Sequence, residues 1–280
     1  MCLDQARLIA WQTGWRDCND AAGSPYTHLI VGFQGTYTSC KDSCQTYTFS
    51  LDCSIPEQKQ VLCKNKAFGT QEARDQVQTW KNANPNLKVL LSIGGNGQNK
   101  CWNADDHNTE STCNKDNAGT LVNDVKKLVD QHGFDGVDIN FEAEANDNNM
   151  QFLYEFTKQL RTAIGNEKII THTPREVEEA KGTKYYDNLK NLKELIDFVI
   201  PQFYNGNSRK LNNVGFDSNV QTMLSGLQEK FDAKQIIFGM CNGDGCLRPE
   251  DSLSSTETAH SSAHARFHTL QQFIQKISKV

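Results

Sequence analysis

Polar residues occupy alternate positions in the segment 135–142, DGVDINFE, which ends on a glutamate. Side chains two apart in a strand point to one face, so Asp138, Asn140 and Glu142 are predicted to share a face over roughly 13 Å. A carboxylic acid at the end of such a strand could protonate a substrate, and a buried carboxylate below it could tune that acid. The alternative is a hydrogen-bonded polar layer with no role in chemistry.

Strand-like and helix-like segments alternate along the chain. About seven apolar runs predict buried strands: ARLIAW, THLIVGF, LKVLLSIGG, GVDINFE, KIITHTP, DFVIPQFYN and QIIFGM. Amphipathic stretches between them begin near Asp or Asn and end before Gly or Pro, as helices do. This alternation indicates a parallel sheet, and strands that are apolar on both faces favour a closed α/β barrel. Such a barrel would place Glu142 at the carboxyl end of its strand, where barrels carry out chemistry.

Residues 1–280 are therefore expected to form a single domain, a (β/α)8 TIM-type barrel. No eighth strand is evident, because a polar stretch after QIIFGM leads into the helix-like AHARFHTLQQFIQKISKV. We expect a barrel that closes in an unusual way or is shortened at its C-terminus. An open doubly wound sheet is the alternative, but no Gly-rich phosphate turn follows the first predicted strand.

Composition and charge exclude several classes of function. The net charge of the 280 residues is −5 and 22% of them are charged, which fits neither a disordered acidic chain nor a basic nucleic-acid binder. No run approaches the roughly 18 apolar residues that a membrane helix needs. We expect an uncharged ligand, a monomer, no cofactor, and neither a nucleic acid nor a membrane as partner.

Ten cysteines predict disulfides, and hence a secreted or extracellular protein. The opening MCLDQARLIA lacks the basic start and apolar run of a signal peptide, so this expectation rests on the cysteines. Local pairs are conceivable, but the sequence does not fix the connectivity. No metal is expected, since no CxxC pair occurs and no histidine lies among the clustered Cys40, Cys44, Cys53 and Cys63. His260, His264 and His268 have metal-compatible helical spacing, but a polar helix face is favoured.

The segment DGVDINFE resembles the DxxDxDxE strand of glycoside hydrolase family 18, the chitinase family. Three other segments agree in order and spacing: THLIVGF resembles the second strand, LLSIGG the SxGG third strand, and PQFYN the sixth strand of the compact plant and fungal class III type. These segments cover most of residues 6–245. The resemblance implies a (β/α)8 barrel that binds N-acetylglucosamine-containing saccharides. It also implies structural roles for Asp135, Gly94 and Gly95.

By this resemblance Glu142 is the general acid and Asp138 is its buried partner. Tyr204 would donate a hydrogen bond to the acetamido carbonyl of the substrate. The acetamido oxygen would attack the anomeric carbon, so β-1,4-linked N-acetylglucosamine would be hydrolysed with retention through an oxazolinium intermediate. Expected substrate contacts are Gln202, Asn205, Trp11 and Phe33; barrel packing is the alternative for the two aromatic rings.

Two departures from the family pattern weaken the predicted enzyme. Asn140 stands where the pattern has aspartate, and losing that charge is expected to cost about 1 to 3 kcal/mol of transition-state stabilisation. All four tryptophans lie at or before Trp102, so the tryptophan of the family's eighth strand has no counterpart. Asn140 and Glu142 also have the Asn-x-Glu form of some endo-β-N-acetylglucosaminidases.

Three functions stay open on the sequence. The retained acid favours a chitinase-type hydrolase with attenuated activity. The lost aspartate and tryptophan favour a chitinase-like lectin that binds such glycans without cleaving them. The Asn-x-Glu form favours an endo-β-N-acetylglucosaminidase acting on N-glycan cores.

Overall fold

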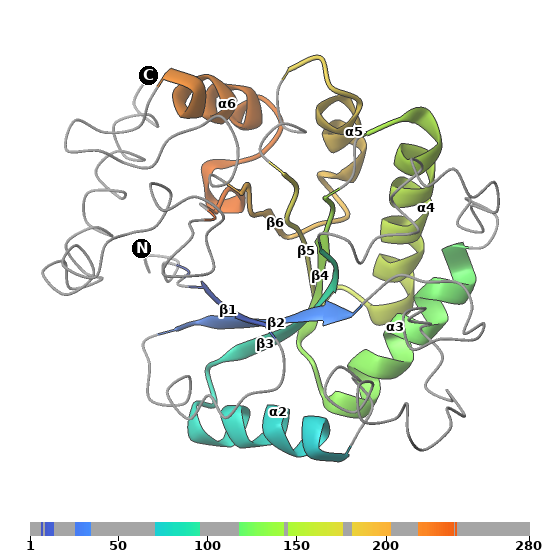
Figure 1. The fold of residues 1–280 in the computed structure, drawn as a ribbon, viewed down its shortest axis with the longest axis vertical. Coiled ribbons are helices and arrows are strands. Elements are labelled where there is room, and N and C mark those ends of the chain that lie inside the picture. The colour runs from blue at the N-terminus through green and yellow to red at the C-terminus, as the bar shows by residue number, and fades with distance from the viewer. Residues whose placement is uncertain are drawn as a thin grey trace, which may run out of the picture.

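The computed structural model describes residue 7 and residues 9–13, 26–34, 71–95, 118–142, 145–175, 181–202, 218–237 and 239. Strands and helices alternate in these ranges, as the sequence predicts (Figure 1). The strands are β1 (Ile9–Thr13), β2 (His28–Gln34), β3 (Lys88–Gly94), β4 (Gly136–Asn140), β5 (Ile169–His172) and β6 (Phe198–Val199). The helices are α2 (Gln71–Ala83), α3 (Ala118–His132), α4 (Asp147–Ile164), α5 (Lys184–Leu192), α6 (Ser218–Gln228) and the short 3-10 helix η3 (Ala233–Gln235).

All six strands belong to one sheet and are parallel to their neighbours. Their spatial order is the sequence order, β1-β2-β3-β4-β5-β6, which is the order of strands in a (β/α) barrel. The register sets Ser92 of β3 and Thr171 of β5 on either side of Asp138 in β4. The three strands therefore bring their polar side chains to the same level of the sheet.

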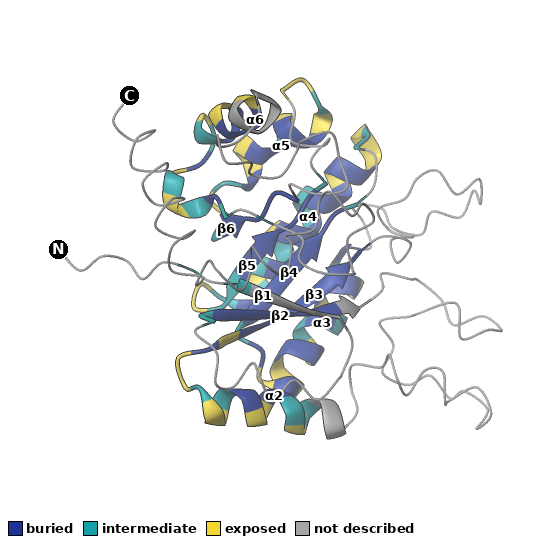
Figure 2. Ribbon diagram, turned by 60° about the vertical axis from the view of Figure 1, so that its left-hand side comes forward, coloured by how far each residue is buried: buried dark blue, intermediate teal, exposed yellow. Residues whose placement is uncertain are grey.

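The sheet has an inner and an outer apolar face. The inner face holds a small cluster of Ile30, Leu90, Phe198 and Ile200, against which Ile9, Ile169 and Ile237 pack. Its members come from β1, β2, β3, β5, β6 and the chain after η3, so the sheet must curve around them. The helices lie around the outside of the strands (Figure 1), and they bury one side against the sheet and expose the other (Figure 2). The larger apolar cluster on this outer face includes Trp80, Val125, Phe156, Leu189 and Leu224.

Arg7 brings the first strand close to the last described segment. Its Nη1 donates a hydrogen bond of 2.6 Å to the carbonyl of Lys234, 227 positions later in the chain. The guanidinium also lies 4.9 Å from the centre of the Phe198 ring, and the His28 ring meets the same ring edge-on at 5.6 Å. Burial, followed by the charge of Arg7, lowers the pKa of His28 to about 4, so the imidazole is neutral at physiological pH. These contacts join the two ends of the sheet, as barrel closure requires.

Within the described part of the chain, the predicted seventh strand contributes two isolated parallel bridges, between Val199 and Ile236 and between Gln202 and Gly239. Pro174 and Pro201 follow β5 and β6, and a proline has no N–H to offer a neighbouring strand. Hydrogen bonding between the chains that continue from β5 and β6 resumes after Pro201, where the Gln202 N–H donates to the Pro174 carbonyl at 3.3 Å. The residues after 239, which show no eighth strand in the sequence, lie outside the described ranges.

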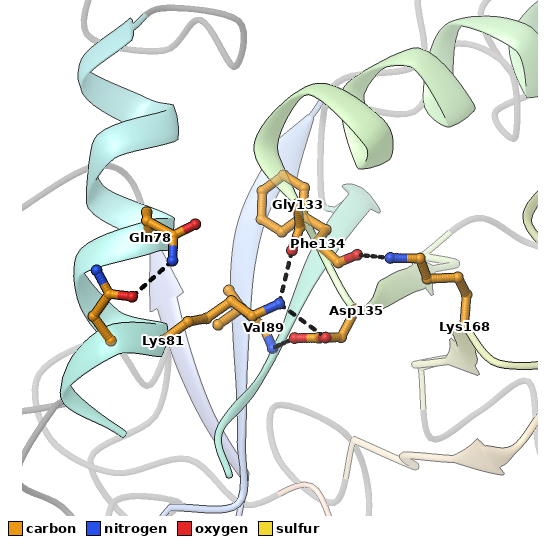
Figure 3. A network of polar contacts seen from close by, with 8 residues as sticks. Gln78, Lys81, Val89, Gly133, Phe134, Asp135 and Lys168 are labelled. Atoms are coloured by element: carbon orange, nitrogen blue, oxygen red, sulfur yellow. Dashed lines mark hydrogen bonds and ion pairs between the residues drawn. The ribbon is translucent and has the colours of Figure 1, made fainter. Parts of the chain in front are cut away.

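Asp135 ties the beginning of β4 to its neighbours (Figure 3). Its carboxylate accepts hydrogen bonds from the Val89 N–H at 2.8 Å and from Lys81 Nζ at 3.0 Å, and Lys81 also donates to the Gly133 carbonyl. Lys168 Nζ donates to the carbonyl of Phe134 at 2.6 Å. Asp135 therefore joins α2 to β3 and β4 at the end of the strand opposite to Glu142.

The helix that follows the polar strand begins at a well-defined cap. The Asn146 side chain accepts a hydrogen bond from the Asn149 N–H at 3.0 Å, and the Asn149 side chain accepts one from the Asn146 N–H at 2.7 Å. This reciprocal pair satisfies N–H groups that an uncapped helix would leave open. The start of α4 is thereby fixed only a few residues after Glu142.

A single methyl group at Gly136 is expected to destabilise the barrel. A Cβ there would lie 2.0 Å from the Ile169 carbonyl oxygen, which cannot move aside without disturbing the β4–β5 pairing. We expect Gly136→Ala to lower the free energy of unfolding by about 1 to 3 kcal/mol in urea titrations. Gly119→Ala is the matched control, because its Cβ would meet only the flexible Gln159 side chain, at 3.1 Å, and alanine favours a helix. An equal loss in both variants would contradict this account.

Candidate active site

The polar residues of β4 lie on its inner face, as the alternation predicts. Asp138 is fully buried and Asn140 is 2% exposed, while the residues that alternate with them, Val137, Ile139 and Phe141, belong to the outer apolar cluster. Glu142 follows the strand at its carboxyl end and is partly buried. The three polar side chains thus form a column that rises from the barrel interior to its rim.

Three hydroxyl groups surround the carboxylate of Asp138. Thr171 Oγ1 and Thr173 Oγ1 donate to its Oδ1 at 2.6 and 2.7 Å, and Ser92 Oγ donates to its Oδ2 at 2.7 Å. Burial raises the pKa of Asp138 to about 6, the hydroxyl groups act to lower it, and the nearby Glu142 adds a small increase. The hydroxyl groups take the place of the water that would solvate this charge at the surface.

Gln202 links the upper part of the column. Its Nε2 lies 3.1 Å from Asn140 Oδ1, 3.3 Å from Glu142 Oε1 and 3.3 Å from the Thr173 carbonyl oxygen. The Asn140 side chain in turn donates a hydrogen bond to Glu142. Both carboxamides therefore present an N–H to the carboxylate of Glu142.

The environment of Glu142 suits a proton donor. Burial raises its pKa, while the hydrogen bonds from Gln202 and Asn140 and the positive charge of Arg175 act in the opposite direction. Burial is the largest of these effects, so Glu142 holds its proton to a higher pH than an ordinary glutamate. A carboxylic acid with a raised pKa at the carboxyl end of a barrel strand can protonate a leaving group at a higher pH than an ordinary glutamate can.

Arg175, Thr171 and Thr173 are site residues that the sequence interpretation missed. Arg175 continues the alternation of the two threonines beyond β5, and its N–H donates to the Phe141 carbonyl at 3.3 Å, next to Glu142. The signal was the spacing of two in the segment THTPR, which puts all three on the face of Asp138. Ser92 belongs to the SxGG segment, and its hydrogen bond to Asp138 was not predicted from the sequence.

Gly94 and Gly95 end β3 beside the column. Their φ angles are 100° and 89°, a backbone conformation that other residues rarely adopt. Gly94 lies opposite Asn140 in the register, and the Gly95 N–H donates to the Asn140 carbonyl at 3.1 Å. The glycines let the chain turn away at the level of Asn140 and keep a hydrogen bond to its backbone.

Several predicted residues cannot be placed in the site. Tyr204 and Asn205, all ten cysteines and the three C-terminal histidines lie outside the described residues. Trp11 and Phe33 lie in β1 and β2, but only their backbone is described. The roles of these residues stay predictions.

Neither a metal site nor a membrane span is found in the described ranges. No group of three or more His, Cys, Asp or Glu within them is arranged to hold a metal ion. No helix in the same ranges is long and apolar enough to cross a membrane.

Asp138 should give the fold a measurable pH dependence. It ionises near 3.8 in the unfolded chain but near 6 in the folded protein, so the folded state binds more protons between these values. The free energy of unfolding should therefore fall as the pH rises through this window, by about 3 kcal/mol in total. Asp138→Asn should remove this contribution, which urea titrations between pH 4 and pH 7 would measure. Parallel pH curves for both proteins would contradict the burial effect.

The curved parallel sheet, the surrounding helices and the column ending at Glu142 define a (β/α) barrel with a proton-donating site at the carboxyl ends of its strands. Residues 7–242 match the family model described as Glycosyl hydrolases family 18. The chain therefore belongs to this family. The resemblance to this family is confirmed, and so is the (β/α)8 barrel as the fold class.

The chain is similar in sequence to an exochitinase. Exochitinase 1 of Streptomyces olivaceoviridis is 31% identical over 113 residues, which are 35% of this chain and 17% of that protein. This chain thus matches less than a fifth of that relative's length.

Two solved structures illustrate the range of similar folds. A chitinase of this family from Pseudoalteromonas aurantia has a TM-score of 0.60 and 18% identity, covering 86% of this chain and 82% of its own. A chitinase-like agglutinin from Robinia pseudoacacia has a TM-score of 0.54 and 14% identity, covering 82% of this chain and 68% of its own. At these identities the likeness is one of fold.

A third solved structure contains a bound saccharide. It is a class V chitinase variant from Nicotiana tobaccum in complex with NAG4, with a TM-score of 0.54 and 16% identity. The match covers 84% of this chain and 66% of that one.

Proposed function

We propose that this protein is a glycoside hydrolase of the chitinase type that cleaves β-1,4-linked N-acetylglucosamine with retention at the anomeric carbon. The observation that carries the proposal is the position and ionisation of Glu142. It lies at the carboxyl end of β4, burial raises its pKa, and two carboxamide N–H groups orient its carboxyl group. Family membership and the chitinases among its relatives support the same reaction class.

In the proposed first step Glu142 gives its proton to the glycosidic oxygen. The bond from that oxygen to the anomeric carbon breaks, and the acetamido oxygen of the same sugar forms a new bond to the carbon. Water then attacks the anomeric carbon of the oxazolinium intermediate, the bond from that carbon to the acetamido oxygen breaks, and the water gives a proton to the Glu142 carboxylate. Two displacements on opposite faces leave the configuration retained, without a glycosyl-enzyme bond.

The other members of the column have supporting roles in this proposal. Asp138 is a buried carboxyl group below the reacting sugar, held by the three hydroxyl groups, and it is negatively charged above its pKa of about 6. Asn140 offers its Oδ1 to the substrate's acetamido N–H, but as a neutral acceptor. Tyr204 would bind the acetamido carbonyl and hold its oxygen toward the anomeric carbon. The missing charge at position 140 makes this a slow enzyme for its family.

A mass-spectrometric time course would test the proposed reaction and its substrate. Chitopentaose and a core N-glycan should be incubated separately with the protein. Shorter chitooligosaccharides, whose fresh reducing ends should be β-configured by proton nuclear magnetic resonance, support the chitinase-type reaction. Cleavage of the N-glycan core alone would instead support an endo-β-N-acetylglucosaminidase, in line with the Asn-x-Glu form of residues 140–142. No product from either substrate would reject both hydrolases.

A lectin that binds these saccharides without cleaving them is the second candidate. The neutral Asn140 favours it, because a binding site needs no charge to stabilise a cationic intermediate. The fold similarity to an agglutinin agrees with this alternative. Titration calorimetry with chitopentaose, run beside the time course, separates the two: binding without products identifies the lectin.

We also propose that the mature protein is monomeric, extracellular and disulfide-bonded. The ten cysteines support the last two points. Peptide mapping without reduction would identify the pairs, and ten free thiols in the secreted protein would reject them.

A further inference from the structure

Gln202, expected from the sequence to contact the substrate, directs its amide N–H group at the protein. Its side chain is almost fully buried, with 5% of the residue exposed. Its Nε2 faces three protein oxygens, which belong to Asn140, Glu142 and the Thr173 backbone. Its donor is therefore directed at the site itself.

The backbone holds Gln202 in place from two sides. Its N–H donates to the Pro174 carbonyl, and the residue forms parallel bridges with Arg175 after β5 and with Gly239 in the seventh segment. Packing is close here, since a Cβ on Gly239 would lie 2.6 Å from the Pro201 carbonyl oxygen. The carboxamide of Gln202 thus projects from a fixed point.

This fixed donor selects one orientation of the Asn140 amide. A carboxamide can turn by 180° and exchange its oxygen and nitrogen. With Oδ1 held 3.1 Å from Gln202 Nε2, the N–H group of Asn140 is the one left for Glu142, in agreement with its lowering effect on the pKa of that acid. The turned amide would set its oxygen against the Glu142 carboxylate and its N–H against the Gln202 N–H, so both contacts would become repulsive.

We propose that Gln202 is a positioning residue that locks the Asn140 amide with its N–H toward Glu142, so that the two carboxamides act on the acid as one unit. This inference rests on the proposed function in assigning Glu142 as the acid. Two charged groups among the described residues also act on Glu142, Asp138 from below and Arg175 from the end of β5. The lock itself is carried by the two carboxamides, since Gln202 Nε2 lies 3.1 Å from Asn140 Oδ1.

Nuclear magnetic resonance titration of the Glu142 carboxyl carbon tests the lock without requiring turnover. The signal is assigned by its loss in Glu142→Gln. Gln202→Met and Asn140→Ala should each raise the pKa of Glu142, because each removes an N–H donor from its carboxylate. The double variant should raise it by less than the two single effects together, since Asn140 is no longer oriented once Gln202 is gone. Full additivity would overturn the proposal.

Steady-state kinetics supply a second readout. Gln202→Met should lower kcat by about tenfold, the effect of losing one hydrogen bond to a charged group, and leave KM within about twofold. A raised KM with unchanged kcat would show that Gln202 contacts the sugar and would overturn the positioning role. The matched control is Gln78→Met on the exposed face of α2, which should leave both kcat and KM unchanged.

A second variant separates the loss of the N–H donor from a loss of folding. Gln202→Glu keeps the shape of the side chain but removes the N–H donor, and its Glu142 pKa should also be raised. A backbone amide spectrum would confirm that each variant is folded. If the unaltered protein cleaves neither saccharide, the proposed function fails, yet the titration still decides whether Gln202 and Asn140 are coupled.

Discussion

Glu142→Gln is expected to lower kcat for chitopentaose by about 10²- to 10⁴-fold, the usual contribution of a general acid. Glutamine has the shape of glutamate but no acidic proton, so the glycosidic oxygen must leave as an unprotonated alkoxide. The variant also lacks the carboxylate that accepts a proton from water in the second step. Binding of the saccharide should persist, because the rest of the column is unchanged.

The measurement is a rate determination by mass spectrometry together with titration calorimetry on the same preparations. Glu194→Gln makes the same chemical change at an exposed position after α5 and should retain full activity. A Glu142→Gln variant that cleaves chitopentaose at the normal rate would show that another group is the acid. The column would then be a structural polar layer.

Asn140→Asp is expected to raise kcat by about 10- to 100-fold, which corresponds to about 1 to 3 kcal/mol of transition-state stabilisation. The carboxylate would accept the acetamido N–H as positive charge develops on the substrate, and a charge-assisted bond is stronger than the present neutral one. Gln202 can still donate to the new carboxylate, so the local geometry should be conserved.

The pH profile gives an independent check on this variant. Activity requires protonated Glu142, so it falls as the pH rises through the pKa of that residue. A second carboxylate beside Glu142 raises this pKa, and the decline should move to higher pH. Asn140→Ala is the comparison, since it supplies neither bond nor charge and should be slower than the unaltered protein. An Asn140→Asp variant no faster than the unaltered protein would show that the neutral amide does not limit the rate.

The alternation of polar and apolar residues made β4 predictable. A spacing of two places Asp138 and Asn140 on one face in any strand, and the buried neighbours Val137 and Ile139 show which face is the outer one. The order of the strands followed in the same way from their alternation with helices. These are local properties of the chain, so they can be recognised in one sequence.

The partners of the column were harder to predict because they depend on register between strands. Thr171 and Thr173 reach Asp138 only because β5 pairs with β4 at one particular offset. Gln202 meets Asn140 only because two isolated bridges, to Arg175 and to Gly239, hold the chain after Pro201 beside the sheet. Offsets of this kind are set by the assembled sheet, and no single segment encodes them.

The hydrogen bond between Arg7 and Lys234 also has a consequence for the order of folding. The two residues are separated by 227 positions, so almost the whole described chain must be synthesised before Arg7, which precedes β1, can form this hydrogen bond. At a synthesis rate of about 5 to 20 residues per second, Arg7 waits about 10 to 45 seconds on the ribosome. The neighbouring ring of His28 meanwhile lacks Phe198, which is also made late. The N-terminal strands therefore spend most of translation with an unfinished inner surface, and closure of the barrel is a late, non-local step.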